Sequence, residues 1–214
     1  MNRNTLIKRG GNMSGNRQWI CKRNNNKNLL ILTRCVFTRE GLRALCSHYP
    51  RWQVHLAPDS AADIKRLLLQ YPMDLVIVDT GFSSADMAAL LALPRMIMGR
   101  SALLTDQDAP VLHDAYRAAG FDMVRGKNSR LAALDSELYA LMNSPYRGDD
   151  NKDDRHYLPQ ERDVLCGLLR GKRPLTIAAE MGISYRDVSR YKLSGLRRIG
   201  ARNMQDIIFS STEK

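Results

Sequence analysis

Residues 181–200, "MGISYRDVSRYKLSGLRRIG", have the pattern of a tight turn followed by an amphipathic helix. Gly182 suits the turn, and Ser184 is a good helix N-cap. Asp187, three residues further on, is placed to return the hydrogen bond in an approximate capping box. On a helical wheel the residues that gather on one side are Val188, Tyr191, Gly195, Leu196 and Ile199. We expect this side to be buried.

The opposite side of this helix is cationic, with Ser189 at its edge. Lys192 lies nearer the core side, so its ammonium group has to extend outward. Two helical segments precede the turn, "PQERDVLCGLLRG" (159–171) and "PLTIAAEM" (174–181). A helix, a Gly-containing turn and a second helix with a basic outer face predict a helix-turn-helix unit, whose second helix enters the major groove of DNA. The same pattern also suits a small helical bundle whose basic face is only solvated.

Each outward side chain has a chemical preference on DNA. Arg190 suits a bidentate contact with guanine, Ser189 suits several bases, and Leu193 suits a thymine methyl group. The other basic side chains suit phosphates, which adds affinity without sequence choice. The candidate DNA-binding residues are therefore Arg186, Ser189, Arg190, Lys192, Leu193, Arg197 and Arg198.

The net charge of +11 is unevenly distributed along the chain. Residues 1–27 hold seven Lys and Arg and no acid, and we expect a disordered basic tail there because apolar periodicity is missing. Residues 155–214 hold twelve Lys and Arg against six Asp and Glu. A local basic excess favours a polyanionic partner through counterion release.

Residues 28–143 alternate strand-like and helix-like segments. The runs "NLLILT" (28–33) and "DLVIVD" (74–79) are continuously apolar, as in strands buried on both faces. Further strands are predicted over 53–57, 95–99 and 121–125, and helices over 39–48, 61–70, 86–93, 109–119 and 129–142. This alternation predicts an α/β domain with a five-stranded parallel, flavodoxin-like sheet. The polar segment 144–156 is predicted to be a linker to a helical domain over 157–212.

Several classes of protein are disfavoured by the sequence. No apolar run approaches the roughly 18 residues of a membrane span, and no secretory signal follows the basic start, so we expect a cytoplasmic protein. The cysteines and histidines are scattered, which disfavours a metal site. No phosphate-binding glycine loop or nucleophile–base pair is evident, so we expect neither a cofactor nor enzymatic activity.

Residues 157–210 resemble the LuxR/FixJ-type helix-turn-helix of bacterial transcription regulators. The matching residues include "PQERDVL", "IAAEMGIS" and "LRRIGARN". Within the family, "VSRYKLSGLRRIG" is most similar to the Rcs capsule regulators and their relative BglJ. The resemblance implies that Ser189, Arg190 and Leu193 reach base edges. It also implies that the last helix, Met204–Phe209, either forms a dimer contact or simply closes the core.

Five βα units before such a domain resemble a two-component response regulator. Its receiver domain holds Mg²⁺ with an acidic pair after the first strand, accepts phosphate on an Asp after the third and balances charge with a Lys after the fifth. Asp79 and Lys127 occupy the second and third of these places, but Thr33 and Arg34 stand where the acidic pair belongs. The resemblance therefore implies a pseudo-receiver in which Asp79 pairs with Lys127 or Arg34.

These expectations combine into one functional hypothesis. The chain is expected to be a sequence-specific transcription regulator on double-stranded DNA, whose pseudo-receiver serves dimerisation with itself or with an RcsB-like regulator. The alternative hypothesis is an interaction protein that sequesters a related regulator and hardly binds DNA.

Overall fold

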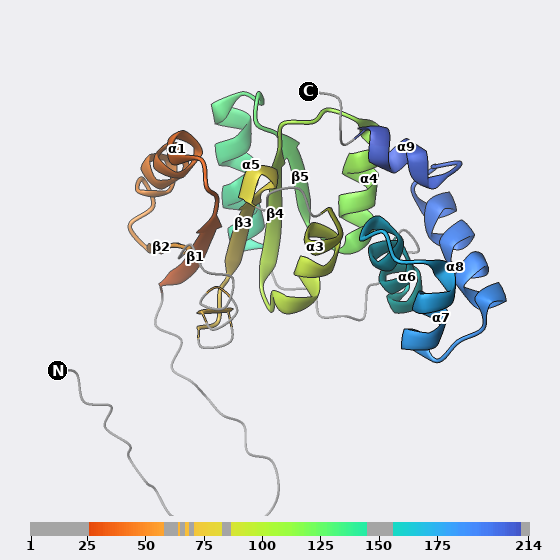
Figure 1. Ribbon diagram of the computed structural model, residues 1–214. Helices are drawn as coiled ribbons and strands as arrows, with labels where there is room; N and C mark the ends of the chain where they lie inside the picture. Colours follow the sequence, from red (N-terminus) through yellow and green to blue (C-terminus); the bar gives the residue numbers. More distant parts are fainter. Residues whose placement is uncertain are drawn as a thin grey trace, which may run out of the picture.

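The computed structural model describes residues 26–57, 64, 67–68, 71–82, 87–144 and 156–210 (Figure 1). The tail expected over residues 1–27 and the linker expected over 144–156 lie outside this set except for their edges. The described residues form an α/β N-terminal domain, up to Ser144, and a helical C-terminal domain, from His156.

The N-terminal domain is built on a five-stranded parallel sheet in the order β2-β1-β3-β4-β5. The strands are β1 (Lys27–Leu32), β2 (Trp52–Leu56), β3 (Leu75–Asp79), β4 (Arg100–Thr105) and β5 (Met123–Gly126). The order reverses between the neighbouring strands β1 and β3. The chain that leaves β1 continues to β2 toward one edge of the sheet, and the chain that leaves β3 continues to β4 toward the other. The predicted fold class is confirmed.

Helices cover both faces of this sheet (Figure 1). One layer contains α1 (Val36–Cys46) and α5 (Leu131–Asn143), and the other contains α3 (Met87–Ala92) and α4 (Pro110–Ala119). Alternate side chains of β1 serve the two layers, since Leu29 and Ile31 join the first and Leu30 and Leu32 join the second. Of the helix predicted over 61–70, the described residues 64, 67 and 68 are helical.

The strand predicted over residues 95–99 is wrong. A 3₁₀ helix, η2 (Leu93–Met96), occupies the start of that segment, and Met98 has 80% of its surface exposed. The chain reaches the sheet at Gly99, where a Cβ atom would lie 2.0 Å from the carbonyl oxygen of Met73. Strand β4 therefore begins one residue later, and Ser101–Thr105 are all buried.

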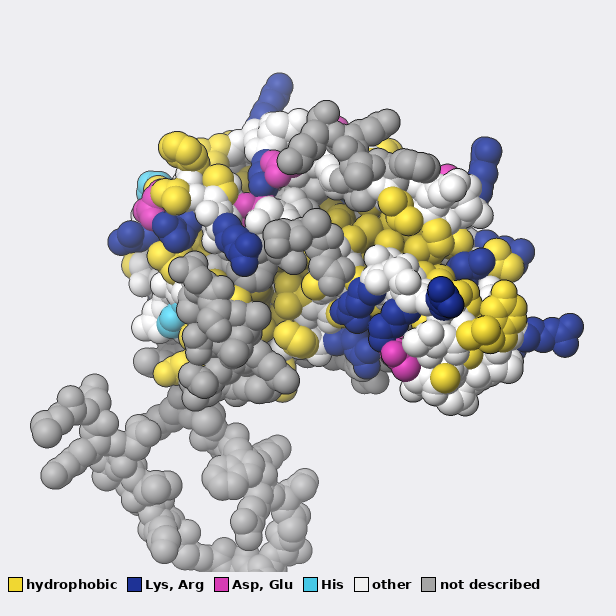
Figure 2. Space-filling model, viewed as in Figure 1, with side chains coloured by type: hydrophobic (Ala, Val, Ile, Leu, Met, Phe, Trp, Pro, Cys, Tyr) yellow, Lys and Arg dark blue, Asp and Glu magenta, His cyan; other side chains and the backbone are white. Residues whose placement is uncertain are grey.

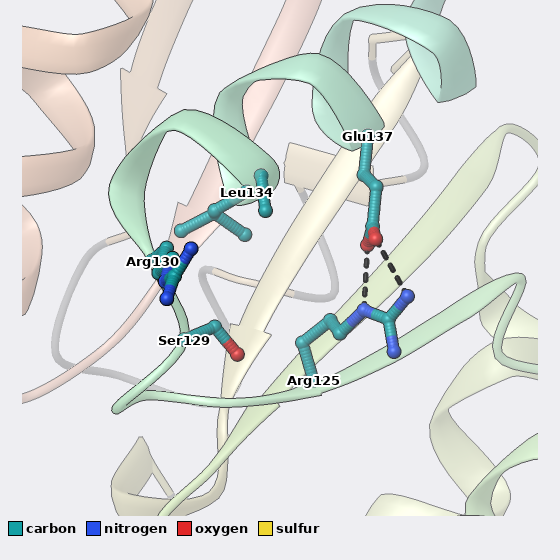
Figure 3. A pocket seen from close by; sticks show the side chains of 6 residues that line it. Arg125, Ser129, Arg130, Leu134 and Glu137 are labelled. Atoms are coloured by element: carbon teal, nitrogen blue, oxygen red, sulfur yellow. Dashed lines mark hydrogen bonds and ion pairs between the residues drawn. The ribbon is translucent and has the colours of Figure 1, made fainter.

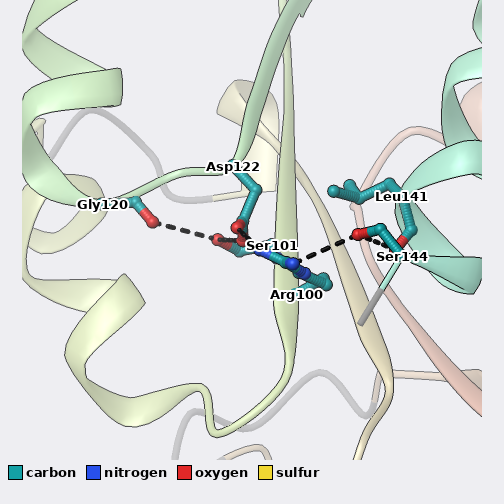
Figure 4. Close-up of polar contacts among 6 residues, drawn as sticks. All are labelled: Arg100, Ser101, Gly120, Asp122, Leu141 and Ser144. Atoms are coloured by element: carbon teal, nitrogen blue, oxygen red, sulfur yellow. Dashed lines mark hydrogen bonds and ion pairs between the residues drawn. The ribbon is translucent and has the colours of Figure 1, made fainter. Parts of the chain in front are cut away.

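Polar contacts fix the beginning of β4 (Figure 4). The Asp122 carboxylate accepts hydrogen bonds from the Ser101 backbone N–H at 2.8 Å and from Arg100 Nη1 at 2.6 Å. Arg100 Nη2 donates to Ser144 Oγ at 3.1 Å, which connects the strand to the end of α5. These contacts explain why β4 starts at a charged residue rather than in the apolar run before it.

The C-terminal domain consists of α6 (Pro159–Leu169), α7 (Pro174–Met181), α8 (Tyr185–Arg198) and α9 (Met204–Ser210). Pro159 and Pro174 stand in the first turns of α6 and α7, where a missing N–H costs no hydrogen bond. In the part of the chain that is described, none of the helices has both the length and the apolar character needed to cross a bilayer.

The two domains share one hydrophobic core. Buried residues of α3 and α4 form a single cluster with Leu165, Cys166 and Ile207 of the C-terminal domain. The Cys166 thiol donates to the carbonyl oxygen of Ala88 at 3.4 Å, which brings α6 against α3. Helix α9 packs on α4, and Ile207 is buried there, so the last helix does close a core.

Candidate nucleic-acid interface and carboxylate cluster

Helix α8 begins with the capping box that the sequence predicts. Ser184 Oγ accepts a hydrogen bond from the Asp187 backbone N–H at 3.1 Å, and the Asp187 carboxylate accepts from the Ser184 backbone N–H at 3.3 Å. Gly182 ends α7 with a left-handed backbone, φ 65°, which a side chain would strain. The turn between α7 and α8 is thus fixed by local hydrogen bonds and one glycine.

One side of α8 is held by α6 and α7. Val188 and Leu196 have 1% and 2% of their surfaces exposed, and Ile199 is also buried. Gly195 allows close approach, because a Cβ atom at this position would lie 2.9 Å from Leu165 Cδ1. Burial of each large side chain contributes about 1.5–3 kcal/mol, so this face determines which side of α8 points outward.

The opposite side of α8 is open. Arg186, Arg190, Leu193 and Arg197 are exposed, whereas Ser189 and Lys192 are half-buried. On the face of the molecule drawn in Figure 2, Lys and Arg side chains gather over the C-terminal helices. Four of the predicted DNA-binding residues, Arg186, Arg190, Leu193 and Arg197, therefore share the exposed side of α8.

Arg190 is held by two neighbours on its own helix. Its Nη2 atom lies 3.0 Å from Asp187 Oδ1, and its guanidinium carbon lies 5.0 Å from the centre of the Tyr191 ring. Hydrogen bonds from the Ser184 hydroxyl and backbone, followed by the charge of Arg190, lower the pKa of Asp187. Asp187 is therefore a carboxylate that serves both the helix cap and Arg190.

Arg198 takes part in a buried polar network around Glu161. The Glu161 carboxylate is fully buried and accepts hydrogen bonds from Ser194 Oγ at 2.6 Å, from Arg198 Nε at 2.6 Å and from the Leu158 backbone N–H at 2.9 Å. The network joins the start of α6 to the second half of α8. Glu161 was not among the residues predicted from the sequence to have a role. The available signal was an acidic residue two positions after Pro159, in the first turn of the predicted helix.

A second polar cluster lies at the carboxyl ends of β1 and β3, where the strand order reverses. Asp79 ends β3 and is 1% exposed. Thr33 Oγ1 donates to Asp79 Oδ2 at 2.7 Å, and the Gly81 backbone N–H donates to Oδ1 at 2.9 Å. Lys127 Nζ lies 2.5 Å from Asp79 Oδ1 and 2.8 Å from Asp106 Oδ2. Lys127 forms the ion pair with Asp79, and the Arg34 side chain is exposed.

The charge of Lys127 is stabilised in this cluster. Burial acts to lower its pKa, but the hydrogen bonds and charges of Asp106 and Asp79 together raise the pKa above its ordinary value. Both oxygens of Asp79 already accept hydrogen bonds. Mg²⁺ prefers several oxygen ligands in octahedral geometry, and after β1 the site offers the hydroxyl of Thr33 and the side chain of Arg34 in place of a pair of carboxylates. The residues at this place do not fit a magnesium site.

A shallow pocket lies between β5 and α5 (Figure 3). Arg125 and Glu137 face each other across it, and the guanidinium donates to both carboxylate oxygens, from Nε at 2.7 Å and from Nη2 at 2.5 Å. These hydrogen bonds raise the pKa of Arg125 and lower that of Glu137. The pocket is thus spanned by an internal ion pair and is separate from Asp79.

Residues 159–210, which span α6 to α9, match the family described as "Bacterial regulatory proteins, luxR family". The C-terminal domain is therefore a LuxR-family helix-turn-helix domain, in which α7 and α8 form the helix-turn-helix motif and α8 is the second helix of that motif. No curated protein sequence matches the chain significantly.

Solved structures of RcsB resemble the chain over both domains. A complex of the two-component response regulator RcsB with DNA has a TM-score of 0.52 and 17% sequence identity, covering 88% of this chain and 98% of that one. RcsB from Salmonella enterica serovar Typhimurium on promoter P1flhDC, with the phosphomimetic BeF₃⁻, has a TM-score of 0.53, 17% identity and coverages of 88% and 98%. A structure of two RcsB dimers on two parallel DNAs has a TM-score of 0.52, 18% identity and the same coverages, 88% and 98%. At such identities the likeness concerns the fold, which is that of a receiver-like domain followed by a LuxR-type domain.

Proposed function

We propose that the chain is a sequence-specific DNA-binding transcription regulator. The observation that supports this most strongly is the open cationic side of α8 in a LuxR-family helix-turn-helix domain. The packed side of the helix is fixed by Val188 and Leu196, so the basic side remains available to the major groove. Arg190 reads a guanine, Ser189 and Leu193 contact neighbouring bases, and Arg186, Lys192 and Arg197 hold phosphates.

Arg198 has a different role in this proposal. Its Nε atom is bonded to the buried Glu161 carboxylate, so we assign Arg198 to holding α8 on α6 rather than to a phosphate.

The N-terminal domain serves dimerisation, with a second copy or with an RcsB-like regulator, rather than phosphorylation. What supports the absence of phosphorylation is the surroundings of Asp79, where Thr33 and the exposed Arg34 stand in the place of the acidic pair that would hold Mg²⁺. Incubation with acetyl phosphate and Mg²⁺, followed by intact-mass measurement, is expected to leave Asp79 unmodified. Stoichiometric phosphorylation of Asp79 would overturn this part of the proposal.

DNA binding is tested by titrating promoter DNA and random DNA at several salt concentrations. Arg190→Ala is expected to lose about 1–3 kcal/mol of discrimination while nonspecific affinity changes little. Lys192→Ala is expected to weaken binding to all sequences about equally and to reduce the salt slope by about one. Absence of specific binding, with and without a related regulator, supports instead the interaction protein that sequesters such a regulator.

A further inference from the structure

Asp187 connects the cap of α8 to Arg190, an exposed arginine of the same helix. One carboxylate oxygen, Oδ2, accepts from Ser184 Oγ at 2.6 Å and from the Ser184 backbone N–H at 3.3 Å. The other oxygen, Oδ1, lies 3.0 Å from Arg190 Nη2. The cap therefore fixes the carboxylate, and the carboxylate in turn restrains the guanidinium three residues further along the same face of the helix.

A second restraint comes from Tyr191. Its ring is half-buried against the cluster of Val164, Ile177 and Val188, and the Arg190 guanidinium lies over it. The Arg190 side chain nevertheless keeps 65% of its surface exposed. Arg190 is thus held from two sides and open toward solvent, where a duplex would lie in the proposed function.

The restraint matters because an arginine on this surface has two competing partners. An unrestrained guanidinium turns to the nearest phosphate, a contact that carries no sequence information. A guanidinium held in one orientation presents its two parallel donors to a guanine edge, and less side-chain freedom is lost on binding. The carboxylate also repels phosphates, which lowers affinity for any sequence.

We propose that Asp187 is a positioning residue that holds Arg190 for reading a guanine, so that the Asp187–Arg190 pair sets the sequence discrimination of α8. The inference rests on the proposed DNA-binding function and adds to it the residue that controls specificity. An exposed ion pair of this kind contributes little to folding stability. Loss of the Asp187–Arg190 pair is therefore expected to change sequence discrimination rather than the free energy of unfolding.

The test uses the full chain and a pool of random-sequence duplexes, from which bound DNA is selected and sequenced. The selected duplex and a scrambled duplex are then used to measure affinity. The informative variant is Asp187→Asn, because an amide oxygen still accepts from Ser184 but carries no charge toward Arg190. Glu180→Gln is the matched control, because it removes one exposed acid that pairs with Lys172 at 2.6 Å in the same domain.

Both variants are expected to bind the scrambled duplex about two- to threefold more tightly, because each removes one negative charge. Only Asp187→Asn is expected to lower discrimination at one guanine of the selected site, by about two- to tenfold. In the Arg190→Ala background, Asp187→Asn is expected to have no further effect on that discrimination. Unchanged melting temperature separates this result from a loss of the helix cap.

The outcomes distinguish the two levels of the proposal. If the wild-type chain selects no sequence, the proposed function fails, and this inference with it. If the wild type selects a site and Asp187→Asn discriminates as well as Glu180→Gln does, the positioning role of Asp187 is refuted while DNA binding stands.

Discussion

The guanidinium of Arg162 donates a hydrogen bond from Nη1 to the carbonyl oxygen of Ala119, at 3.3 Å, across the boundary between the two domains. The preceding carbonyl, of Ala118, accepts from the Tyr157 backbone N–H at 2.7 Å. The last carbonyls of a helix have no partner within it and attract cations. The C-terminal domain therefore caps the end of α4, and burial together with the nearby Arg95 lowers the pKa of Arg162.

Removal of this cap tests how firmly the domains are joined. Arg162→Ala is expected to lower the free energy of unfolding by about 1–2 kcal/mol, since a packed stem and a charged hydrogen bond are lost. Chemical denaturation followed by circular dichroism measures the change. The control is Arg117→Ala, a basic residue in the last turn of α4 that pairs with Asp114 on the surface, and a change below about 0.5 kcal/mol is expected there. Equal effects of the two substitutions would mean that the interdomain cap adds nothing.

The Glu161 network provides a second prediction. Glu161→Gln is expected to cost about 3–5 kcal/mol, because Arg198 loses its charged partner in a buried setting. A double-mutant cycle with Arg198→Met isolates the pair, and a coupling energy near zero would contradict the prediction. The exposed pair Lys172–Glu180 is the comparison, for which about 0–1 kcal/mol is expected.

The Lys127–Asp79 pair predicts a dependence of stability on alkaline pH. Lys127→Met is expected to cost about 1–3 kcal/mol at neutral pH, because Asp79 keeps its buried charge without a cation. The folded state raises the pKa of Lys127, so this contribution is fully present below the unfolded pKa of about 10.4 and is lost as pH rises through the folded value. Urea unfolding of both proteins from pH 7 to 11 measures the difference, which should shrink only at the alkaline end. A difference that already shrinks near pH 8 would show that the pair does not stabilise the charge of Lys127.

Two cysteines differ in their predicted reactivity. Hydrogen bonds involving Thr38 lower the pKa of the exposed Cys35 thiol, whereas burial raises the pKa of Cys46 to about 12. Cys35 is therefore expected to react with iodoacetamide at pH 8 much faster than Cys46, because the thiolate is the nucleophile. Peptide mass spectrometry measures both rates. Thr38→Val should slow Cys35, Thr38→Ser should not, and equal rates in all three proteins would rule out the role of the Thr38 hydroxyl.

Much of the fold was predictable because burial leaves a direct pattern in sequence. The continuous apolar runs at Leu29–Leu32 and Leu75–Val78 form the central strands, with both faces covered. The fourth strand was misplaced because the Met and Ile residues of 95–99 are as apolar as "SALLT" at 101–105. What decides between the two segments is the close contact of Gly99 with Met73 and the hydrogen bonds of Asp122, which depend on distant parts of the chain.

The exposed side of α8 was predictable for a similar reason, since two residues along a helix are about 200° apart and Val188 and Arg190 therefore point to opposite sides. The partners of the charged residues were not. Arg197 and Arg198 are adjacent arginines that the sequence alone does not distinguish. Only the packing of α6 on α8 places Glu161 beside Arg198. The contact between the domains was also hidden, because the apolar residues of α6 serve two neighbours. Val164 packs with Ile177 and Val188, whereas the Cys166 thiol reaches Ala88 in α3.

The core that the two domains share has a practical consequence for dissecting the chain. In the intact chain, Tyr157, Cys166 and Ile207 belong to one buried cluster with residues of α3 and α4. In a fragment that begins near Tyr157, these three side chains would be exposed to water. Such a fragment would expose an apolar surface that favours self-association. Affinity for DNA is therefore best measured with the intact protein. With a truncated helical domain, self-association of the fragment would add to any signal from DNA binding.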